Sequence, residues 1–197
     1  MRAFLVSVPV FFFACGPMVK GAPDAGGQDL CNGPAKTPAN LIENGGFECD
    51  LSPAAWAGSS IYGTFEIVDG GHSGRAGKVT VNAGGGRMSY AKDFAVDAGM
   101  KSFCFSAFLS GTAPFMRMRV LAGGTNQEVD QSDQIFSDWR RLPLGTALEV
   151  PNNNATKLQL VFEVQTNRAT QNALPGDTML IDDVDVWESS THCMETR

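Results

Sequence analysis

Short segments in which every second residue is apolar recur along the chain, and this period of two most constrains its fold. In residues 102–109, Phe103, Phe105, Ala107 and Leu109 fall on one side. Alternating or apolar runs of the same kind are found at 78–81, 115–121, 158–165 and 179–187. Because successive side chains of a β-strand point to opposite faces, each run is predicted to be a strand with a buried face.

The composition supports a fold made of strands. The 22 glycines and 10 prolines separate the apolar runs, and no window of helical length has apolar residues spaced three and four apart. A chain of 197 residues, 43% hydrophobic and 18% charged, suffices for one well-buried domain with short appendages. We therefore predict an all-β chain that forms a two-sheet antiparallel β-sandwich.

The first residues are predicted to be an export signal. Arg2 is followed by a continuous apolar stretch from Ala3 to Ala14. Such a stretch spans about 18 Å as a helix, too short for a hydrocarbon core of about 30 Å. We assign residues 1–14 to a signal peptide, 15–30 to a flexible Gly/Pro/Ala-rich tether, and 31–197 to the domain.

Cys15 stands where a lipid anchor would be attached. The sequence Phe12-Phe13-Ala14-Cys15-Gly16 resembles the lipobox of bacterial lipoproteins, except that Phe replaces the usual Leu. The resemblance implies lipidation of Cys15 and, because Gly16 is not Asp, an outer-membrane or cell-surface location. The alternative is an ordinary secretory signal with an incidental Cys15, which predicts a secreted protein.

Four cysteines remain when Cys15 is set aside: Cys31, Cys49, Cys104 and Cys193. Exported proteins occupy an oxidising compartment, so two disulfides are expected. Four cysteines allow three pairings, and the sequence does not choose among them. No two of them form a CxxC pair, which argues against a zinc site.

Charge and motifs exclude several functions. The formal net charge is -6, and no cluster of Lys and Arg is present, so we expect no nucleic-acid partner. The chain has no GxSxG, HExxH, P-loop or dinucleotide-binding motif, and its two histidines, His72 and His192, lie far apart. We expect a non-enzyme.

Four motifs, in order along the chain, resemble landmarks of carbohydrate-binding modules of families 4, 9 and 22. They are Asn40–Glu48 with Trp56, the His-Ser-Gly turn of Gly71–Val79, the Trp strand Asp138–Leu142, and the closing strand Ile181–Val186. The resemblance implies a galactose-binding-like jelly roll, with the first motif as its opening strand. It also implies an opening strand beside the closing strand, and hence the disulfides Cys31–Cys193 and Cys49–Cys104.

The same resemblance implies a structural calcium ion where the first and last strands meet. Calcium prefers six to eight oxygen ligands, both carboxylates and carbonyls. The implied set is Gly46 and His72 through their carbonyls, and Glu48, Asp69 and Asp182 or Asp183 through their side chains. Alternation predicts that Asp182 and Asp183 point to opposite faces, which leaves the ligating one open. Alternatively, Asp182, Asp183 and Asp185 are charges that protect a sheet edge from aggregation.

Sugar-binding candidates follow from the polar faces of the predicted strands. Arg117 and Arg119 alternate with Met116, Met118 and Val120, while Gln159 and Glu163 alternate with Leu160, Phe162 and Val164. Aromatic rings pack on sugar C–H faces, and planar polar groups bind the hydroxyls. Tyr62 and Tyr90 are the predicted platforms, with Trp56 as a loop-borne possibility, because the resemblance places Trp56 and Trp139 in packed positions.

These observations favour a monomeric, non-catalytic surface protein that binds a polysaccharide or other glycan and contacts the membrane only through its lipid. Two alternatives remain at this point. One is a structural or adhesion domain that contacts protein, in which Arg117 and Arg119 simply pair with Glu163. The other is a hydrolase that uses an unrecognised pair of carboxylates.

Overall fold

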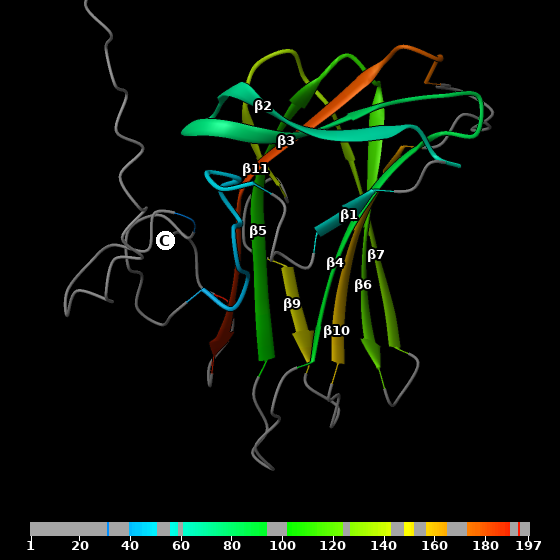
Figure 1. The fold of residues 1–197 in the computed structure, drawn as a ribbon. Helices are drawn as coiled ribbons and strands as arrows, with labels where there is room; N and C mark the ends of the chain where they lie inside the picture. The colour runs from blue at the N-terminus through cyan, green and yellow to red at the C-terminus, as the bar shows by residue number, and fades with distance from the viewer. Residues whose placement is uncertain are drawn as a thin grey trace, which may run out of the picture.

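The computed structural model describes residues 31, 40–50, 56–58, 61–93, 102–123, 127–142, 148–151, 157–164, 173–189 and 193. These residues form eleven β-strands and no helix (Figure 1). None of the described segments is a helix with the length and apolarity that crossing a bilayer requires. The predicted signal peptide, the tether and Cys15 lie outside the described residues, as does His192.

The strands form two antiparallel sheets. The five-stranded sheet has the order β1-β4-β10-β6-β7. Its strands are β1 (Trp56–Gly58), β4 (Gly86–Asp93), β10 (Lys157–Val164), β6 (Phe115–Gly123) and β7 (Gln127–Gln134). All of its pairings are antiparallel, which confirms the predicted kind of sheet.

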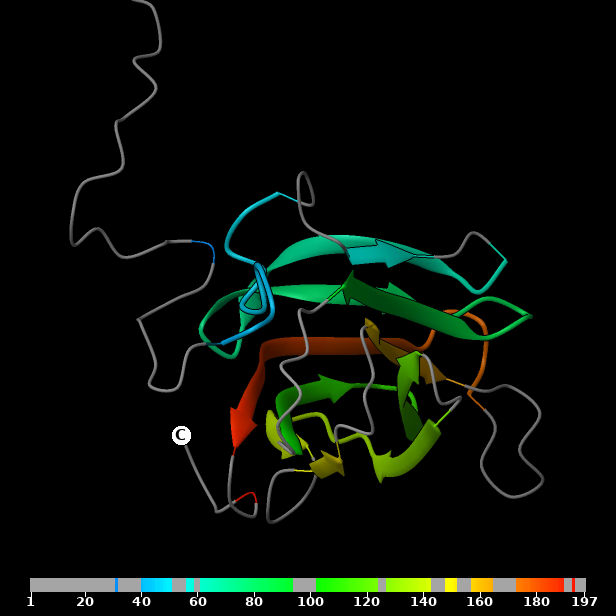
Figure 2. The ribbon, with the colours of Figure 1, turned by 90° about the horizontal axis from the view of Figure 1, so that it is seen from below.

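The second sheet has six strands in the order β2-β3-β11-β5-β8, with β9 also paired to β5. Its strands are β2 (Thr64–Gly71), β3 (Gly74–Thr80), β11 (Thr178–Ser189), β5 (Ser102–Gly111), β8 (Arg140–Leu142) and β9 (Leu148–Pro151). Seen from below, β11, in orange to red, lies between β5 and the β2–β3 hairpin (Figure 2). The long closing strand is therefore interior to its sheet, and the edge-charge interpretation of Asp182, Asp183 and Asp185 is wrong.

The core lies between the sheets and contains the predicted apolar faces. Phe103, Phe105, Ala107 and Leu109 of β5 are almost completely buried. Opposite strands contribute Met116, Met118, Leu160, Phe162 and Val164 to the same apolar cluster. Each buried Phe or Leu contributes roughly 1.5–3 kcal/mol relative to an exposed position. The period of two thus predicted both the strands and their inward faces, and the two-sheet sandwich is confirmed.

The opening segment, defined here as residues 40–48, differs from the predicted strand. Its backbone turns repeatedly, with positive φ angles at Asn44 and Phe47, and it contains no assigned strand. It nevertheless lies beside the closing strand (Figure 1): Leu41 N donates to Val186 O at 2.7 Å, and Val184 N donates to Gly45 O at 2.9 Å. The predicted neighbourhood is correct, although the local conformation is irregular.

The disulfides join Cys31 to Cys49 and Cys104 to Cys193, so the predicted pairing is wrong. The Cα atoms are 5.1 Å apart in the first pair and 5.6 Å in the second. Cys104 of β5 is in register with Trp187 of β11, and the chain reaches Cys193 soon after that strand ends. The end of β11 therefore meets the start of β5, while Cys31 lies at the end of the opening segment.

Candidate functional site

The outer face of the five-stranded sheet presents a row of charged residues that crosses three strands. Arg87 of β4 is in register with Glu163 of β10, and Glu163 is in register with Arg117 of β6. All three alternate with core residues, so their side chains point away from the sandwich interior. We call Arg87, Glu163 and Arg117 the arginine row. Sequence analysis gave pairing of Arg117 and Arg119 with Glu163 as an alternative, and the register places Arg117 beside Glu163.

Glu163 forms an ion pair within this row. Its Oε1 lies 3.4 Å from Nη1 of Arg117, and the two side chains are 15% and 29% exposed. The predicted pairing with Arg117 is therefore confirmed. Because both groups are largely shielded from water, the attraction between them is screened less than in an exposed pair.

Arg87 was missed by the sequence analysis. Its side chain is half-buried, and among the described residues its guanidinium has no hydrogen-bond or ion-pair partner. The available signal was the alternation of Arg87, Ser89 and Ala91 with the buried Met88 and Tyr90. That pattern marks a strand with one polar face, as in the strands that were predicted.

A second row lies next to the arginine row on the same face. It contains Ser89 of β4, Val161 of β10 and Arg119 of β6 in register. Val161 is fully buried although it alternates with core residues and points outward. Half-buried Gln159 lies two residues further along β10. Neighbouring groups therefore cover Val161, and the row presents polar side chains on this face.

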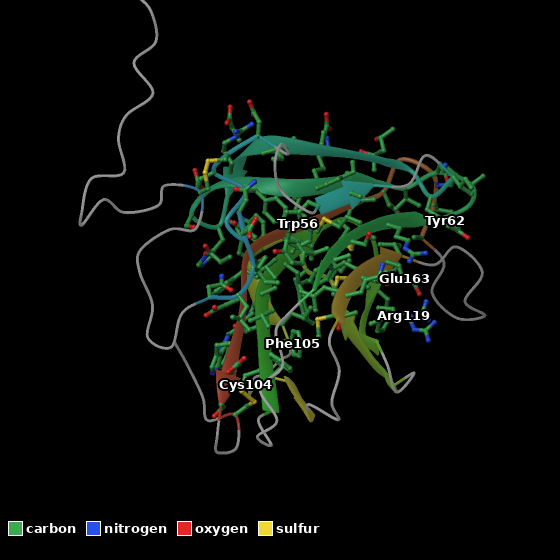
Figure 3. All side chains as sticks on the ribbon, turned by 60° about the horizontal axis from the view of Figure 1, so that its bottom comes forward. Trp56, Tyr62, Cys104, Phe105, Arg119 and Glu163 are labelled. Atoms are coloured by element: carbon green, nitrogen blue, oxygen red, sulfur yellow. A yellow bond between two sulfur atoms is a disulfide. The ribbon has the colours of Figure 1, made fainter. Side chains whose placement is uncertain are left out.

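Tyr62 and Phe115 lie at the end of the sheet that carries the arginine row. Tyr62 is 39% exposed, and its carbonyl accepts a hydrogen bond from Arg87 N at 2.9 Å. Figure 3 shows Tyr62 on the same side of the molecule as Glu163 and Arg119. Phe115 is the first residue of β6, is half-buried, and shares the outward parity of Arg117. Sequence analysis did not select it.

Tyr90 is not available as a sugar platform, which corrects that prediction. It is 1% exposed, its hydroxyl accepts a hydrogen bond from Glu43 N at 3.2 Å, and its ring lies 5.1 Å from that of Trp56. The alternation of β4 places it with Met88 on the core side. Trp56 is also buried, with its indole N–H donating to Glu43 O at 3.1 Å, so it is excluded as a loop-borne contact. Trp139 is half-buried near His72.

The turn between β2 and β3 gathers most of the predicted calcium ligands. Ser73 N donates to Oδ2 of Asp182 at 2.9 Å, and Nδ1 of His72 lies 2.7 Å from Oδ2 of Asp183. Arg75 N donates to Oε1 of Glu48 at 3.0 Å. A side chain added at Gly46 would meet Oδ1 of Asp183 at 3.7 Å, so Gly46 lies beside this cluster.

Two details of the predicted calcium set are wrong. Asp182 and Asp183 both contact the turn instead of pointing to opposite faces, because β11 has a bulge between Asp182 and Asp185 and Asp183 has a positive φ angle. Asp69 is not brought to the cluster: its side chain is fully exposed and lies 4.0 Å from Nε of Arg75. In the part of the chain that the structure describes, no three His, Cys, Asp or Glu side chains are arranged to hold a metal ion.

Asp182 has the most perturbed acidity of the cluster. Its side chain is completely buried, and this burial raises the pKa of the carboxyl from 3.8 to about 7. The hydrogen bond from Ser73 opposes the shift, whereas the adjacent Asp183 carboxylate adds to it. A buried carboxylate with another beside it favours either a proton or a bound cation.

No protein-family model matches the sequence. No curated protein matches it either. Among solved structures, the chain is similar to TmCBM61 in complex with β-1,4-galactotriose, with 17% identity over 76% of this chain and 99% of that chain, at a TM-score of 0.51. It also resembles the enzymatically active domain of tailspike protein 4 of bacteriophage CBA120, with 12% identity over 76% of this chain but 21% of that chain, at a TM-score of 0.52.

These similarities define the fold. The chain has the two-sheet jelly roll of carbohydrate-binding modules, as the order of its sequence motifs implied. The identities are low, and one fold can support many functions, so the ligand depends on the residues of this chain.

Proposed function

We propose that the protein is a non-catalytic glycan-binding module and that the outer face of its five-stranded sheet is the binding site. The observation that carries this proposal is the arginine row with Tyr62 at its end. It places guanidinium and carboxylate groups on the same side of a jelly-roll sheet as a partly exposed ring. This is the combination that sugar recognition requires.

Different side chains of the proposed site would make different contacts with a sugar. Tyr62 offers an aromatic surface on which the C–H face of a sugar ring can pack. The Arg117–Glu163 pair and Gln159 offer donors and acceptors that are already positioned for hydroxyl groups.

The arginine row does not contain a pair of carboxylates. The row holds one carboxylate, Glu163, and it is paired with Arg117. Glycoside hydrolysis commonly needs two carboxylates about 5–10 Å apart. We therefore propose binding without catalysis. We also propose that the chain is exported, is tethered to the membrane through lipidated Cys15, and acts as a monomer.

A glycan array probed with the full chain, alongside two single variants, tests the proposal. We expect Tyr62→Ala to weaken selective binding to a glycan class by about tenfold or more, because it removes the aromatic surface. Ile61→Ala is the matched control, since Ile61 is the adjacent exposed side chain and belongs to no part of the proposed site. Absence of binding to every glycan would contradict the proposal and favour a structural or adhesion domain.

We further propose that calcium binds at the β2–β3 turn, with carboxylate oxygens from Glu48 and Asp182 and carbonyl oxygens from Gly46 and His72. The buried, doubly acidic surroundings of Asp182 support this, because calcium would balance their charge. Binding would require the carboxylates to exchange their present hydrogen bonds from Ser73 and Arg75 for metal contacts.

Thermal unfolding with calcium, magnesium or chelator tests the calcium proposal. At a hundredfold excess over Kd, calcium should stabilise the fold by about 2.7 kcal/mol. Glu48→Gln should remove this gain, whereas Asp69→Asn should retain it because the Asp69 side chain is outside the cluster. A calcium response equal to that of magnesium would argue against a specific site.

A further inference from the structure

The arginine row on the outer face of the five-stranded sheet is locally basic on an acidic protein. The chain carries a formal net charge of -6. The charged side chains described on this face are nevertheless three arginines, Arg87, Arg117 and Arg119, and one acid, Glu163. Asp93, Glu128 and Asp130 occupy outward positions further along the sheet, so the excess of positive charge is confined to the arginine row.

Within the arginine row, Glu163 forms an ion pair with Arg117, one of its two arginine neighbours. Oε1 of Glu163 lies 3.4 Å from Nη1 of Arg117, while Arg87 on the other side has no ion-pair partner among the described residues. The Arg87 side chain is also half-buried. Partial removal of a cation from water is costly unless an anion compensates it, so an anionic ligand group at Arg87 would relieve this cost.

We propose that the glycan bound at this face is acidic, and that Arg87 binds its carboxylate or sulfate group. The inference rests on the proposed function and specifies its ligand class. The guanidinium of arginine presents a planar fork that binds carboxylate and sulfate oxygens through two parallel hydrogen bonds. The backbones of Tyr62 and Arg87 are adjacent, because Arg87 N donates a hydrogen bond to the Tyr62 carbonyl, so we assign both side chains to one binding site.

A polysaccharide is favoured over nucleic acid as the source of the anion. Nucleic-acid binding depends on many phosphate contacts along a basic surface, and the net charge of -6 opposes it. A glycan with one acid per sugar unit needs a single well-placed cation with polar and apolar surface around it, which this face provides.

Affinity electrophoresis of the full chain through gels that contain matched polysaccharides tests the inference. De-esterified polygalacturonan and its fully methyl-esterified form share a backbone, and the methyl esters remove the negative charge. Dextran sulfate and neutral dextran form the corresponding sulfate pair, and β-1,4-galactan serves as a neutral ligand. We expect the charged member of at least one pair to bind tenfold or more tightly, and the pair that shows this identifies the anion as carboxylate or sulfate.

Variants then assign the effect to Arg87. Arg87→Gln should reduce binding of the preferred acidic glycan by about tenfold or more, and Arg87→Lys should restore only part of it because the planar fork is lost. Arg140→Gln removes the same charge from the other sheet and should have no effect. Circular dichroism and thermal unfolding should show all three variants folded.

The outcomes separate this inference from the proposed function. Equal binding of the acidic and neutral members, or binding that Arg87→Gln leaves intact, overturns the acidic ligand and leaves glycan binding in place. Equal losses in Arg87→Gln and Arg140→Gln indicate general attraction to polyanions and also overturn it. No binding to any of the five polysaccharides counts against both, and the glycan array then decides whether the proposed function itself fails.

Discussion

Replacing Asp182 with asparagine should change how the stability of the domain depends on pH. The Asp182 carboxyl is completely buried in the β2–β3 turn cluster, and its burial raises its pKa from 3.8 to about 7. The folded protein therefore binds this proton more tightly than the unfolded chain does. Between about pH 4 and pH 7 the native state carries more protons at this site, so the free energy of unfolding falls as pH rises.

The size of this pH dependence follows from how far the pKa of Asp182 is raised. A change of about three pKa units corresponds to about 4 kcal/mol of stability lost between pH 4 and pH 8, as an upper bound. Asparagine cannot ionise, so the variant should lack this part of the pH dependence. It also offers one acceptor oxygen in place of the two that receive Ser73 N and Asp183 N, at a cost of about 1 kcal/mol. Asp182→Asn should thus be slightly less stable than the wild type at pH 4 and more stable at pH 8.

Urea unfolding monitored by tryptophan fluorescence, in chelator at pH 4.5, 6 and 8, measures this crossover. Asp69→Asn is the control, because the Asp69 side chain is fully exposed and no stability change of this size is expected. If Asp182→Asn shows the same pH profile as the wild type, the reasoning about the buried carboxyl is refuted. Repeating the series with calcium should reverse the ranking at pH 8 if calcium binds there.

Two further changes test what holds the ends of the domain together. Asn40→Ala should cost about 2–3 kcal/mol in urea unfolding, because Asn40 Nδ2 donates to Val184 O at 2.9 Å and its Oδ1 accepts from Val186 N at 3.0 Å. Replacing both Cys104 and Cys193 with serine should cost about 4–5 kcal/mol, since that disulfide closes the long loop between β5 and the end of the chain. If either variant unfolds with a free energy within about 1 kcal/mol of that of the wild type, the stabilising role proposed for the Asn40 hydrogen bonds or for the Cys104–Cys193 disulfide is contradicted.

The alternation of apolar and polar residues predicted many of the strands and the faces that they bury. The runs around Phe103, Phe105 and Leu109, and around Met116 and Met118, became strands whose apolar sides fill the core. The order of the four sequence motifs implied the jelly roll, and the comparisons with solved structures confirmed that fold.

Errors arose where the outcome depended on a single inserted residue or on packing between strands. The bulge in β11 turns Asp182 and Asp183 toward the same turn, which strict alternation forbids. Tyr90 alternates correctly with its neighbours, but only the packing of β4 against Trp56 shows that its side of the strand is the buried one.

The sequence by itself therefore determined the strands, their two faces and the all-β class, because the period of two is a property of the local backbone. The tertiary structure decided the strand register, and with it the row of Arg87, Glu163 and Arg117, since residues far apart in the chain meet only through hydrogen bonding between strands. It also decided the disulfide pairing, because Cys193 finds Cys104 through the position of β11 in the sheet. Such non-local contacts depend on how the whole chain packs, and no short segment encodes them.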